Sequence, residues 1–404
     1  MSKRVPAALL AFCMMPMLLS ACAGRQEPSE LPEDAVKQEE PAPFEEPDVP
    51  EAPPEEEFLR LPEGTAPLKP YDEVFLKLPD WDFVTPYLIG KEFFDPDDLH
   101  TYRYESNLIF EGSQELAEQL LEEGKNPGLG VRGLHEQGIT GAGVNVAIID
   151  QNLLPDHPEY AGCLADYYDS GCNTGERGSM HGPAVLSILA GETLGVAPGA
   201  KVYYAAAPSW ELDAAYYADC LNWIVEQNEA LPEGEKIRVV SVSAAPERWP
   251  GGGGYTNSDQ WVEAVAAAEE AGILVIDVRN AKTGFVGLSY CMGGPSDNVQ
   301  KYRPGTPLST VPNREDMVFA PACFRTTAQE YTKGNYIYTY WGEGGVSWSV
   351  PYVAGVLALG WQINPELDAE AMKELLLQSA WVDGRGCHMI DPPAFIELVQ
   401  ATVE

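Results

Sequence analysis

The sequence predicts an α/β fold in which helices cover both faces of a mainly parallel sheet. From residue 127 onward, short apolar runs rich in β-branched residues alternate with segments of helical character. Parallel strands are buried on both faces, so they appear in a sequence as nearly continuous apolar runs. Polar residues stand where two of these runs end, and function in open α/β sheets gathers at the carboxyl ends of strands.

The elements of this region follow one another in a regular order. The predicted strands are apolar runs, and they span residues 144–150, 201–207, 237–244 and 273–278. The predicted helices have apolar residues at helical spacing or a high apolar content, and they span residues 129–138, 181–191, 220–231, 259–272 and 347–363. These elements define a main domain at residues 127–404.

The first 22 residues are typical of an export signal. Two basic residues precede an apolar run of roughly 17 residues, which is short for a membrane span and suited to a signal peptide. The run ends Leu-Ser-Ala-Cys at Cys22, which resembles the bacterial lipobox whose cysteine is lipidated after cleavage. We therefore expect a bacterial lipoprotein that is extracytoplasmic and anchored to the cell membrane. The alternative is an ordinary signal peptide with an incidental cysteine.

Two segments lie between the signal and the main domain. Residues 23–67 are rich in Pro and Glu with few apolar residues, so we expect a disordered acidic stalk. Residues 68–126 have enough apolar residues to fold, and residues 113–124 have helical spacing. We expect an N-terminal extension or cap here. A removable inhibitory propeptide is an alternative, although no processing signal is evident.

The charge balance restricts the partners of the chain. The net charge is −37, from 25 basic and 62 acidic residues, with no basic patch to reverse it. Nucleic acids and anionic membrane surfaces are therefore excluded as partners, and we expect membrane contact only through the lipid anchor. We expect a monomer. Six cysteines lie beyond Cys22; Cys163 and Cys172 could close a small loop, or all six could be free thiols.

Three residues could together perform nucleophilic catalysis. Asp150 ends an apolar strand, His181 begins an apolar helix, and Ser347 stands at the start of the helix 347–363 after a glycine-rich turn. Alone, each would be an ordinary capping, turn or surface residue. Together they supply an acid to orient the histidine, a base that titrates near neutral pH, and a nucleophile. Ser349 is the second candidate for the nucleophile.

A fourth residue could stabilise the charge that develops during such a reaction. Asn280 follows the strand at 273–278, and its side-chain amide could donate a hydrogen bond to an oxyanion. We find no cysteine or histidine spacing of a zinc site and no Asp-rich loop with calcium-ligand spacing, so no metal or other cofactor is predicted.

In this order the segments resemble the subtilisin-like serine proteases, or subtilases. The similar segments are GLHEQGITGAGVNVAIID, HGPAVLSILAGETLGVAPGAKVYY, WVEAVAAAEEAGILVIDVRN, GVSWSVPYVAGVLAL and GCHMIDPPAFIELV, from about residue 127 to the end. The resemblance implies a three-layer sandwich and makes Asp150 the orienting acid, His181 the base, Ser347 the nucleophile and Asn280 the oxyanion donor. Calcium is common in this family.

The chain departs from the family pattern around each of these residues. Pro and Ala follow Gly182 where the family has Thr and His, and Val346 and Trp348 flank the serine. Arg279 replaces the glycine that precedes the oxyanion asparagine, where the family shapes its S1 pocket; it would block that pocket or favour an acidic P1 side chain. Ser243 matches the substrate-pairing strand of the family, without the expected glycine after it.

The sequence therefore predicts a serine endopeptidase with peptide or protein substrates and a narrow specificity. An alternative is a catalytically impaired pseudoprotease that serves as a peptide-binding or docking module, because the motif flanks are altered. A third hypothesis is a solute-binding lipoprotein, which fits the export signal and the α/β content but has no need of an ordered triad.

Overall fold

The computed structural model describes residues 58–79, 84–248, 254–278, 285–305 and 314–403. The expected signal and lipidated Cys22, most of the expected stalk, Arg279 and Asn280 lie outside these residues.

The main sheet is parallel throughout and confirms the predicted fold class. Its order is β6 (Leu164–Asp169), β7 (Lys201–Ala206), β5 (Asn145–Asp150), β8 (Ile237–Val242) and β9 (Leu274–Asp277). Four of these strands coincide with the predicted apolar runs. The edge strand β6 was not predicted, because LADYYD is half polar and an edge strand need not be apolar on both faces.

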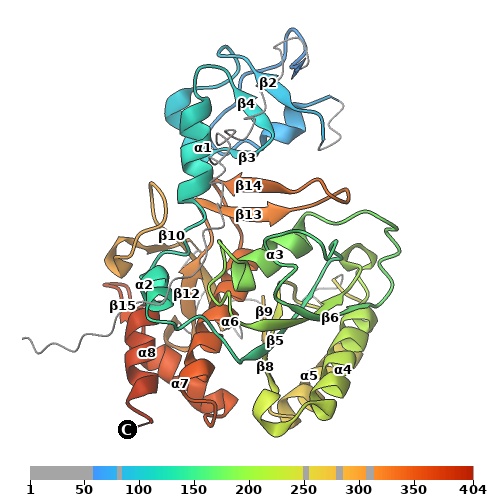
Figure 1. Cartoon of the computed structure of the whole chain (residues 1–404), viewed down its shortest axis with the longest axis vertical. Helices are drawn as coiled ribbons and strands as arrows, with labels where there is room; N and C mark the ends of the chain where they lie inside the picture. The colour runs from blue at the N-terminus through green and yellow to red at the C-terminus, as the bar shows by residue number, and fades with distance from the viewer. Residues whose placement is uncertain (1–57, 80–83, 249–253, 279–284, 306–313, 404) are drawn as a thin grey trace, which may run out of the picture. The chain divides into compact units, whose positions relative to one another are not determined.

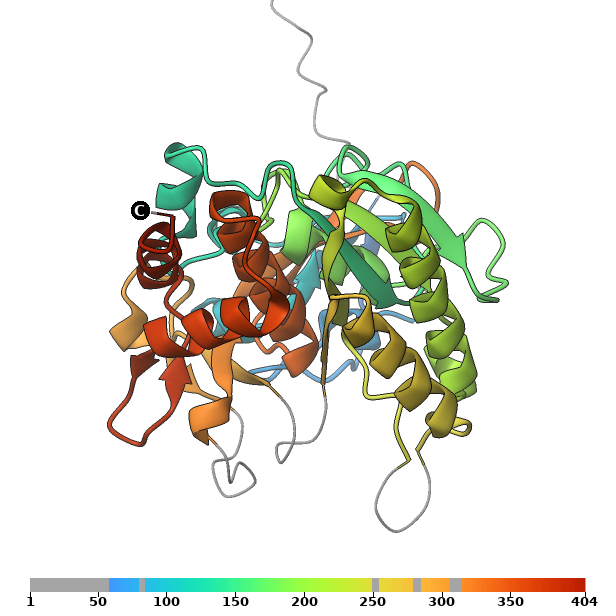
Figure 2. The same cartoon turned by 90° about the horizontal axis from the view of Figure 1, so that it is seen from below.

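Helices cover both faces of this sheet and make the three layers. The side chains of β5 alternate: Val146 and Ile148 join one core cluster, whereas Ala147 and Ile149 join another. The first cluster contains α3 (His181–Ala190) and α6 (Val346–Ile363), and the second contains α4 (Ala214–Ala230) and α5 (Ser258–Glu270). Figure 1 and Figure 2 show α4 and α5 packed together on one side of the strands.

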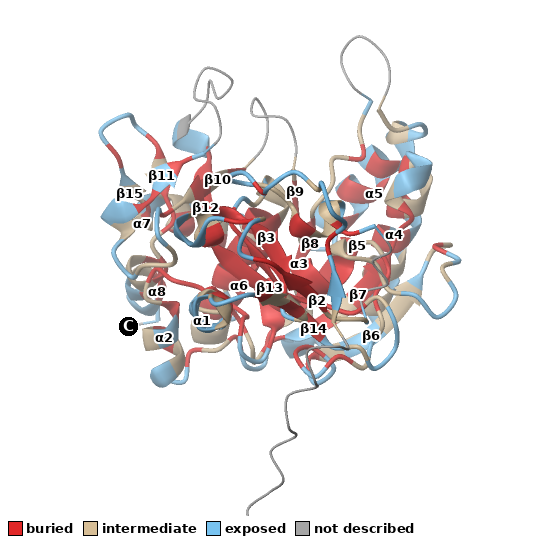
Figure 3. Ribbon diagram, turned by 90° about the horizontal axis from the view of Figure 1, so that it is seen from above, coloured by how far each residue is buried: buried red, intermediate tan, exposed pale blue. Residues whose placement is uncertain are grey.

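Helix α6 is the centre of the larger cluster. It has 18 residues and is apolar enough to cross a membrane by length and composition, but 78% of it is buried inside the protein. Figure 3 shows that buried residues concentrate in this helix and in the neighbouring strands. Such burial identifies a core helix, because its apolar surface is already covered by the sheet.

A second sheet lies beside α6, and of its strands only β16 falls in a segment that the sequence analysis singled out, GCHMIDPPAFIELV. Its order is β11 (Arg303–Pro304), β10 (Val286–Tyr290), β12 (Val318–Pro321), β16 (His388–Met389) and β15 (Trp381–Val382). These strands are short, so their local sequence pattern is weak. The remaining helices of the domain are α2 (Val131–Glu136), α7 (Ala369–Ser379) and α8 (Pro392–Gln400). Short 3-10 helices span Val74–Lys77, Pro96–Thr101, Ser209–Glu211, Glu233–Glu235, Val299–Lys301 and Arg314–Asp316.

The N-terminal segment, residues 58–126, has its own small core and also shares a sheet with the main domain. Its own elements are β1 (Leu59–Arg60), β2 (Tyr87–Ile89), β4 (Leu108–Phe110) and α1 (Gln114–Glu123). The shared sheet contains β3 (Arg103–Glu105), β14 (Ile337–Trp341) and β13 (Arg325–Gln329), with β14 in the middle and both pairings antiparallel.

Packed structure begins before residue 68, where the sequence placed the end of the stalk. Leu61 is 8% exposed and belongs to the core of the N-terminal segment, and β1 pairs with β2. Leu61 provides the burial that the preceding Pro- and Glu-rich sequence lacks, and Phe58 is partly buried.

Candidate active site

Asp150 ends β5 as a buried, fully oriented carboxylate. Its side chain is 4% exposed. One oxygen, Oδ1, accepts two hydrogen bonds: from His181 Nδ1 at 2.7 Å and from the backbone N–H of Gln151 at 2.7 Å. These bonds assign the Nδ1 proton of His181, which leaves Nε2 free to accept one.

His181 begins α3 against the loop that follows Asp150. Gly182 makes this approach possible, because an added Cβ would overlap the carbonyl oxygen of Gln151. Burial lowers the pKa of His181, but the charge of Asp150 and its hydrogen bond outweigh burial, so the pKa is raised above its ordinary value. The histidine therefore has the environment of a base that holds a proton during a reaction.

Ser347 lies in the first turn of α6, and its backbone is held by Ser243. Pro351 lies inside the helix and has no N–H, so the Ser347 carbonyl lacks its helical donor. The Ser243 hydroxyl donates to this carbonyl at 2.8 Å. Ser243, which the sequence predicted to bind substrate, thus joins the end of β8 to the turn that contains the candidate nucleophile.

Trp348 connects this turn to His181. Its side chain is 3% exposed, and the two ring centroids are 5.0 Å apart. Its other side contacts Trp341 of β14, with ring centroids 5.1 Å apart. Over the described ranges, no hydrogen bond joins Ser347 Oγ to His181, and the contact between this turn and the histidine is made by Trp348.

A cavity lies directly beside His181. It has a volume of about 190 Å³. Its lining residues come from six separate parts of the chain: Asp150, Gln151, His181, Ser209, Tyr217, Ser243, Ala244 and Tyr255. Asp150, His181 and Ser243 of the predicted site therefore share one cavity wall.

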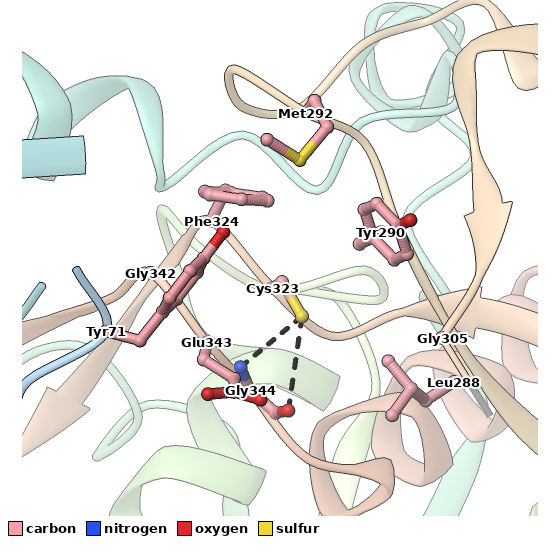
Figure 4. A pocket seen from close by; sticks show the side chains of 10 residues that line it. All are labelled: Tyr71, Leu288, Tyr290, Met292, Gly305, Cys323, Phe324, Gly342, Glu343 and Gly344. Carbon is pink, nitrogen blue, oxygen red and sulfur yellow. Dashed lines mark hydrogen bonds between the residues drawn. The ribbon is translucent and has the colours of Figure 1, made fainter. Parts of the chain in front are cut away.

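A second cavity, of about 270 Å³, adjoins the loop that leads to Ser347 (Figure 4). Glu343 and Gly344 of this loop form part of its wall, and the Gly344 N–H donates to Cys323 Sγ at 3.4 Å. Tyr71 of the N-terminal segment and Phe324 supply aromatic rings to the wall. The remaining lining residues are Leu288, Tyr290, Met292, Gly305 and Gly342.

The other predicted site residues are placed as follows. Ser349, the second candidate nucleophile, is fully buried and its hydroxyl donates to the Ala320 carbonyl at 2.8 Å, so it does not face a substrate. Asn280 and Arg279 lie outside the described residues. Where the structure is described, no group of three His, Cys, Asp or Glu side chains could hold a metal ion.

Sequence reasoning missed several residues that line the site. Trp348 was noted only as a departure from a motif, and Tyr217, Tyr255 and Tyr71 were not singled out. Aromatic residues in helices and loops have no local pattern that distinguishes a cavity wall from an ordinary core position. Only the neighbourhood of a motif residue, as with Trp348, offered a signal.

Comparison with known proteins finds sequences of one family. Residues 141–277 match the sequence model of the subtilase family, a range that contains Asp150, His181 and Ser243 and ends before Ser347. Subtilisin NAT of Bacillus subtilis subsp. natto is 27% identical over 243 residues, which are 56% of this chain and 57% of that protein. Subtilisin of Bacillus pumilus is 26% identical over 56% of this chain and 79% of that protein.

Within residues 141–277 the chain is similar to the subtilase family. It spans about half the length of subtilisin NAT. Among solved structures, the chain is similar to fervidolysin of Fervidobacterium pennivorans, described as a keratinolytic enzyme related to subtilisin. The TM-score is 0.49 with 19% identity over 67% of this chain and 45% of fervidolysin. It is also similar to the prenylagaramide maturation protease PagA, with a TM-score of 0.49 and 18% identity over 67% of this chain and 98% of that one. The similarity to subtilases rests on the sequence matches, because this structural likeness is low.

Proposed function

We propose that this protein is a serine endopeptidase that hydrolyses peptide bonds through Asp150, His181 and Ser347. The observation that carries the proposal is the 2.7 Å bond from His181 Nδ1 to a carboxylate that is 4% exposed. A buried carboxylate that orients a histidine beside a cavity has a clear chemical use in activating a nucleophile.

In the proposed mechanism, His181 Nε2 takes the proton of the Ser347 hydroxyl as its oxygen attacks the peptide carbonyl. The imidazolium that forms is stabilised by Asp150, and it then gives the proton to the leaving amine. The acyl-enzyme is hydrolysed by water, with His181 again acting as base. At the start of α6 the Trp348 N–H donates to the Gly345 carbonyl, and the other first N–H groups have no acceptor one turn earlier in the helix. The positive end of the helix dipole therefore favours an oxyanion, with Asn280 as a further donor.

The cavity in Figure 4 supports a preference for substrates with a large apolar side chain near the cleaved bond. It is lined by Tyr71, Phe324 and Met292. Its wall also contains Glu343 and Gly344, which precede Ser347 in the chain. Tyr71 belongs to the N-terminal segment, which would therefore contribute to substrate selection. Cleavage of a peptide library by the wild type and by Tyr71→Ala tests this, since an unchanged preference in the variant contradicts it.

A fluorophosphonate probe tests the proposed nucleophile without knowledge of the substrate. We expect the full chain to be labelled, Ser347→Ala to lose labelling, and Ser349→Ala to keep it, because the Ser349 hydroxyl is buried on the Ala320 carbonyl. Labelling that persists in Ser347→Ala would assign the reaction to another residue.

A second candidate function is a pseudoprotease that binds peptides without cleaving them. It is favoured by the lack of a hydrogen bond between Ser347 and His181 among the residues described, and by the bulky Trp348 against the histidine. Catalytic hydrogen bonds often tighten only when substrate binds, so this geometry does not decide between the two functions. A folded chain that binds peptide, is not labelled and does not cleave would favour the pseudoprotease.

We propose further that the protein acts outside the cytoplasm on a lipid anchor at Cys22. The apolar run, the small residues before Cys22 and the acidic Pro-rich segment after it support this. We expect the wild type to fractionate with membranes and to incorporate labelled fatty acid, and Cys22→Ser to lose both. Fatty acid incorporation that persists in Cys22→Ser would overturn the proposal.

A further inference from the structure

Arg325, the first residue of β13, is a buried cation that no acidic group among the described residues neutralises. It is 3% exposed. Within the described part of the chain its guanidinium makes no ion pair, and its Nε is enclosed without a hydrogen-bond acceptor. Uncompensated charges at such depth are strongly destabilising, because burial removes their hydration.

Two aromatic side chains lie close to this guanidinium. The central carbon of the guanidinium, Cζ, lies 5.9 Å from the ring centroid of Tyr352. Tyr302 is the other side chain that would raise the pKa of Arg325 if it were ionised. Burial raises the pKa of both phenols, so neither carries a negative charge at neutral pH. Burial lowers the pKa of Arg325 only to about 10, and the side chain stays cationic at neutral pH.

Arg325 lines a small cavity together with two thiols. The cavity wall also contains Tyr302, Cys291 and Cys323. Burial raises the pKa of both thiols, so neither provides an internal thiolate as counter-ion. The Tyr302 hydroxyl accepts from the Ser296 N–H at 3.1 Å, which leaves its own proton free to donate.

The size of this cavity restricts what can occupy it. The centre of a water-sized particle can move within a volume of about 10 Å³. This is room for roughly one such particle. Carboxylates, phosphate and sulfate are too large. A monatomic anion comes closest to this size and has the compensating charge, and Arg325 and Tyr302 in the cavity wall carry hydrogen-bond donors.

We propose that Arg325 and Tyr302 hold a single halide ion, chloride in biological fluids, in this cavity. The ion compensates the buried guanidinium. Tyr352 lies on α6, the helix that begins beside Ser347, and Cys323 accepts from the N–H of Gly344 in the loop before it. The bound ion would therefore stabilise the part of the core that supports the candidate nucleophile.

Thermal unfolding of the full chain in detergent tests this site. Chloride replaces gluconate at constant ionic strength, so that only the identity of the anion changes. We expect the Tm of the wild type to rise by about 2 °C for each tenfold increase in chloride above its Kd. In Arg325→Met the Tm should not respond to chloride, and in gluconate it should equal or exceed that of the wild type, because no buried charge remains. Arg303→Met, which changes an exposed arginine nearby, should keep the full response.

Crystals of the wild type grown with bromide give a second readout that does not depend on any variant folding. We expect an anomalous peak within hydrogen-bond distance of the Arg325 guanidinium. A wild-type Tm that does not respond to chloride, an equal response in Arg325→Met, or no bromide at Arg325 would each overturn the proposal. Water at that position without bromide would show that the cavity is only hydrated.

Discussion

Asp150→Asn separates the charge of Asp150 from its geometry. In the wild type both hydrogen bonds, from His181 and from the Gln151 N–H, end on the same oxygen, Oδ1. An asparagine that places its carbonyl oxygen there accepts both bonds, with its amide group in the place of Oδ2. The substitution therefore removes the negative charge and leaves the orientation of the histidine intact.

The size of the effect follows from the 2.7 Å contact. The centres of the imidazolium and carboxylate charges then lie about 4 Å apart. At an effective dielectric constant near 20, opposite charges at this separation attract by about 4 kcal/mol. Because Asp150 is 4% exposed, water screens this attraction little. Without this attraction, the transition state in which His181 is protonated is less stable by about 4 kcal/mol. The reaction is therefore expected to be about 10³-fold slower.

The assay is the rate at which a fluorophosphonate probe acylates Ser347, measured as a function of pH. In the wild type the rate should rise with pH through a midpoint above 6.5, because Asp150 raises the pKa of His181. In Asp150→Asn only burial remains, which lowers this pKa, so the midpoint should fall below 6.5 and the plateau should drop by about 10³-fold. Asp166→Asn, an exposed substitution on β6, is the matched control.

A plateau within tenfold of the wild type together with an unchanged midpoint would refute this reasoning, provided that the variant keeps its Tm. Asp150 would then be a structural residue at the end of a strand. A large loss of rate with an unchanged midpoint would mean that the histidine had been reoriented, contrary to the hydrogen bonds described.

Three further predictions concern the surroundings of the site. Burial raises the pKa of Glu105 to about 7, more than nearby Arg103 lowers it, so the folded state holds this proton more tightly than the unfolded state. The free energy of unfolding should fall by about 3 kcal/mol between pH 4.5 and 7, and this fall should vanish in Glu105→Gln. Arg103→Met should destabilise the protein by about 3 kcal/mol in denaturant unfolding at pH 8, because it leaves the Glu105 carboxylate buried and unpaired. Ser243→Ala should lower stability by about 1 kcal/mol and slow probe labelling, because the Ser347 carbonyl loses its donor.

Controls for these variants come from exposed positions. Arg132→Met changes a solvent-exposed arginine and should leave stability within about 0.5 kcal/mol of the wild type. Combining Arg103→Met with Glu105→Gln should recover part of the loss, and failure to do so would mean that the pair does not interact. Ser243→Ala that is labelled at the wild-type rate would argue against a role in positioning Ser347.

The glycines before α6 provide a matched pair for the fifth prediction. A Cβ at Gly344 would overlap the carbonyl oxygen of Ala322, whereas a Cβ at Gly345 would meet only the Ser347 nitrogen at 3.9 Å. Gly344→Ala should therefore shift the loop and slow labelling by at least about tenfold, and Gly345→Ala should not. Equal labelling of both variants would contradict a tightly packed loop.

The amino-acid sequence by itself determined the main sheet and its helices, because buried parallel strands and core helices have strong local patterns. It also placed Asp150 at the end of a strand and His181 at the start of a helix, positions that a parallel sheet brings to one edge. The sequence did not predict β6 and the short strands of the second sheet, whose local patterns are weak. Their stability comes from neighbours distant in the chain.

Only the tertiary structure decided how the site is assembled. The bond from Ser243 to the Ser347 carbonyl, the ring contact of Trp348 with His181, and the place of Tyr71 in a cavity wall all join segments far apart in the sequence. Local sequence pattern records which face of a strand or helix is buried. It does not record which distant side chain meets that face, since that choice depends on the packing of the whole core.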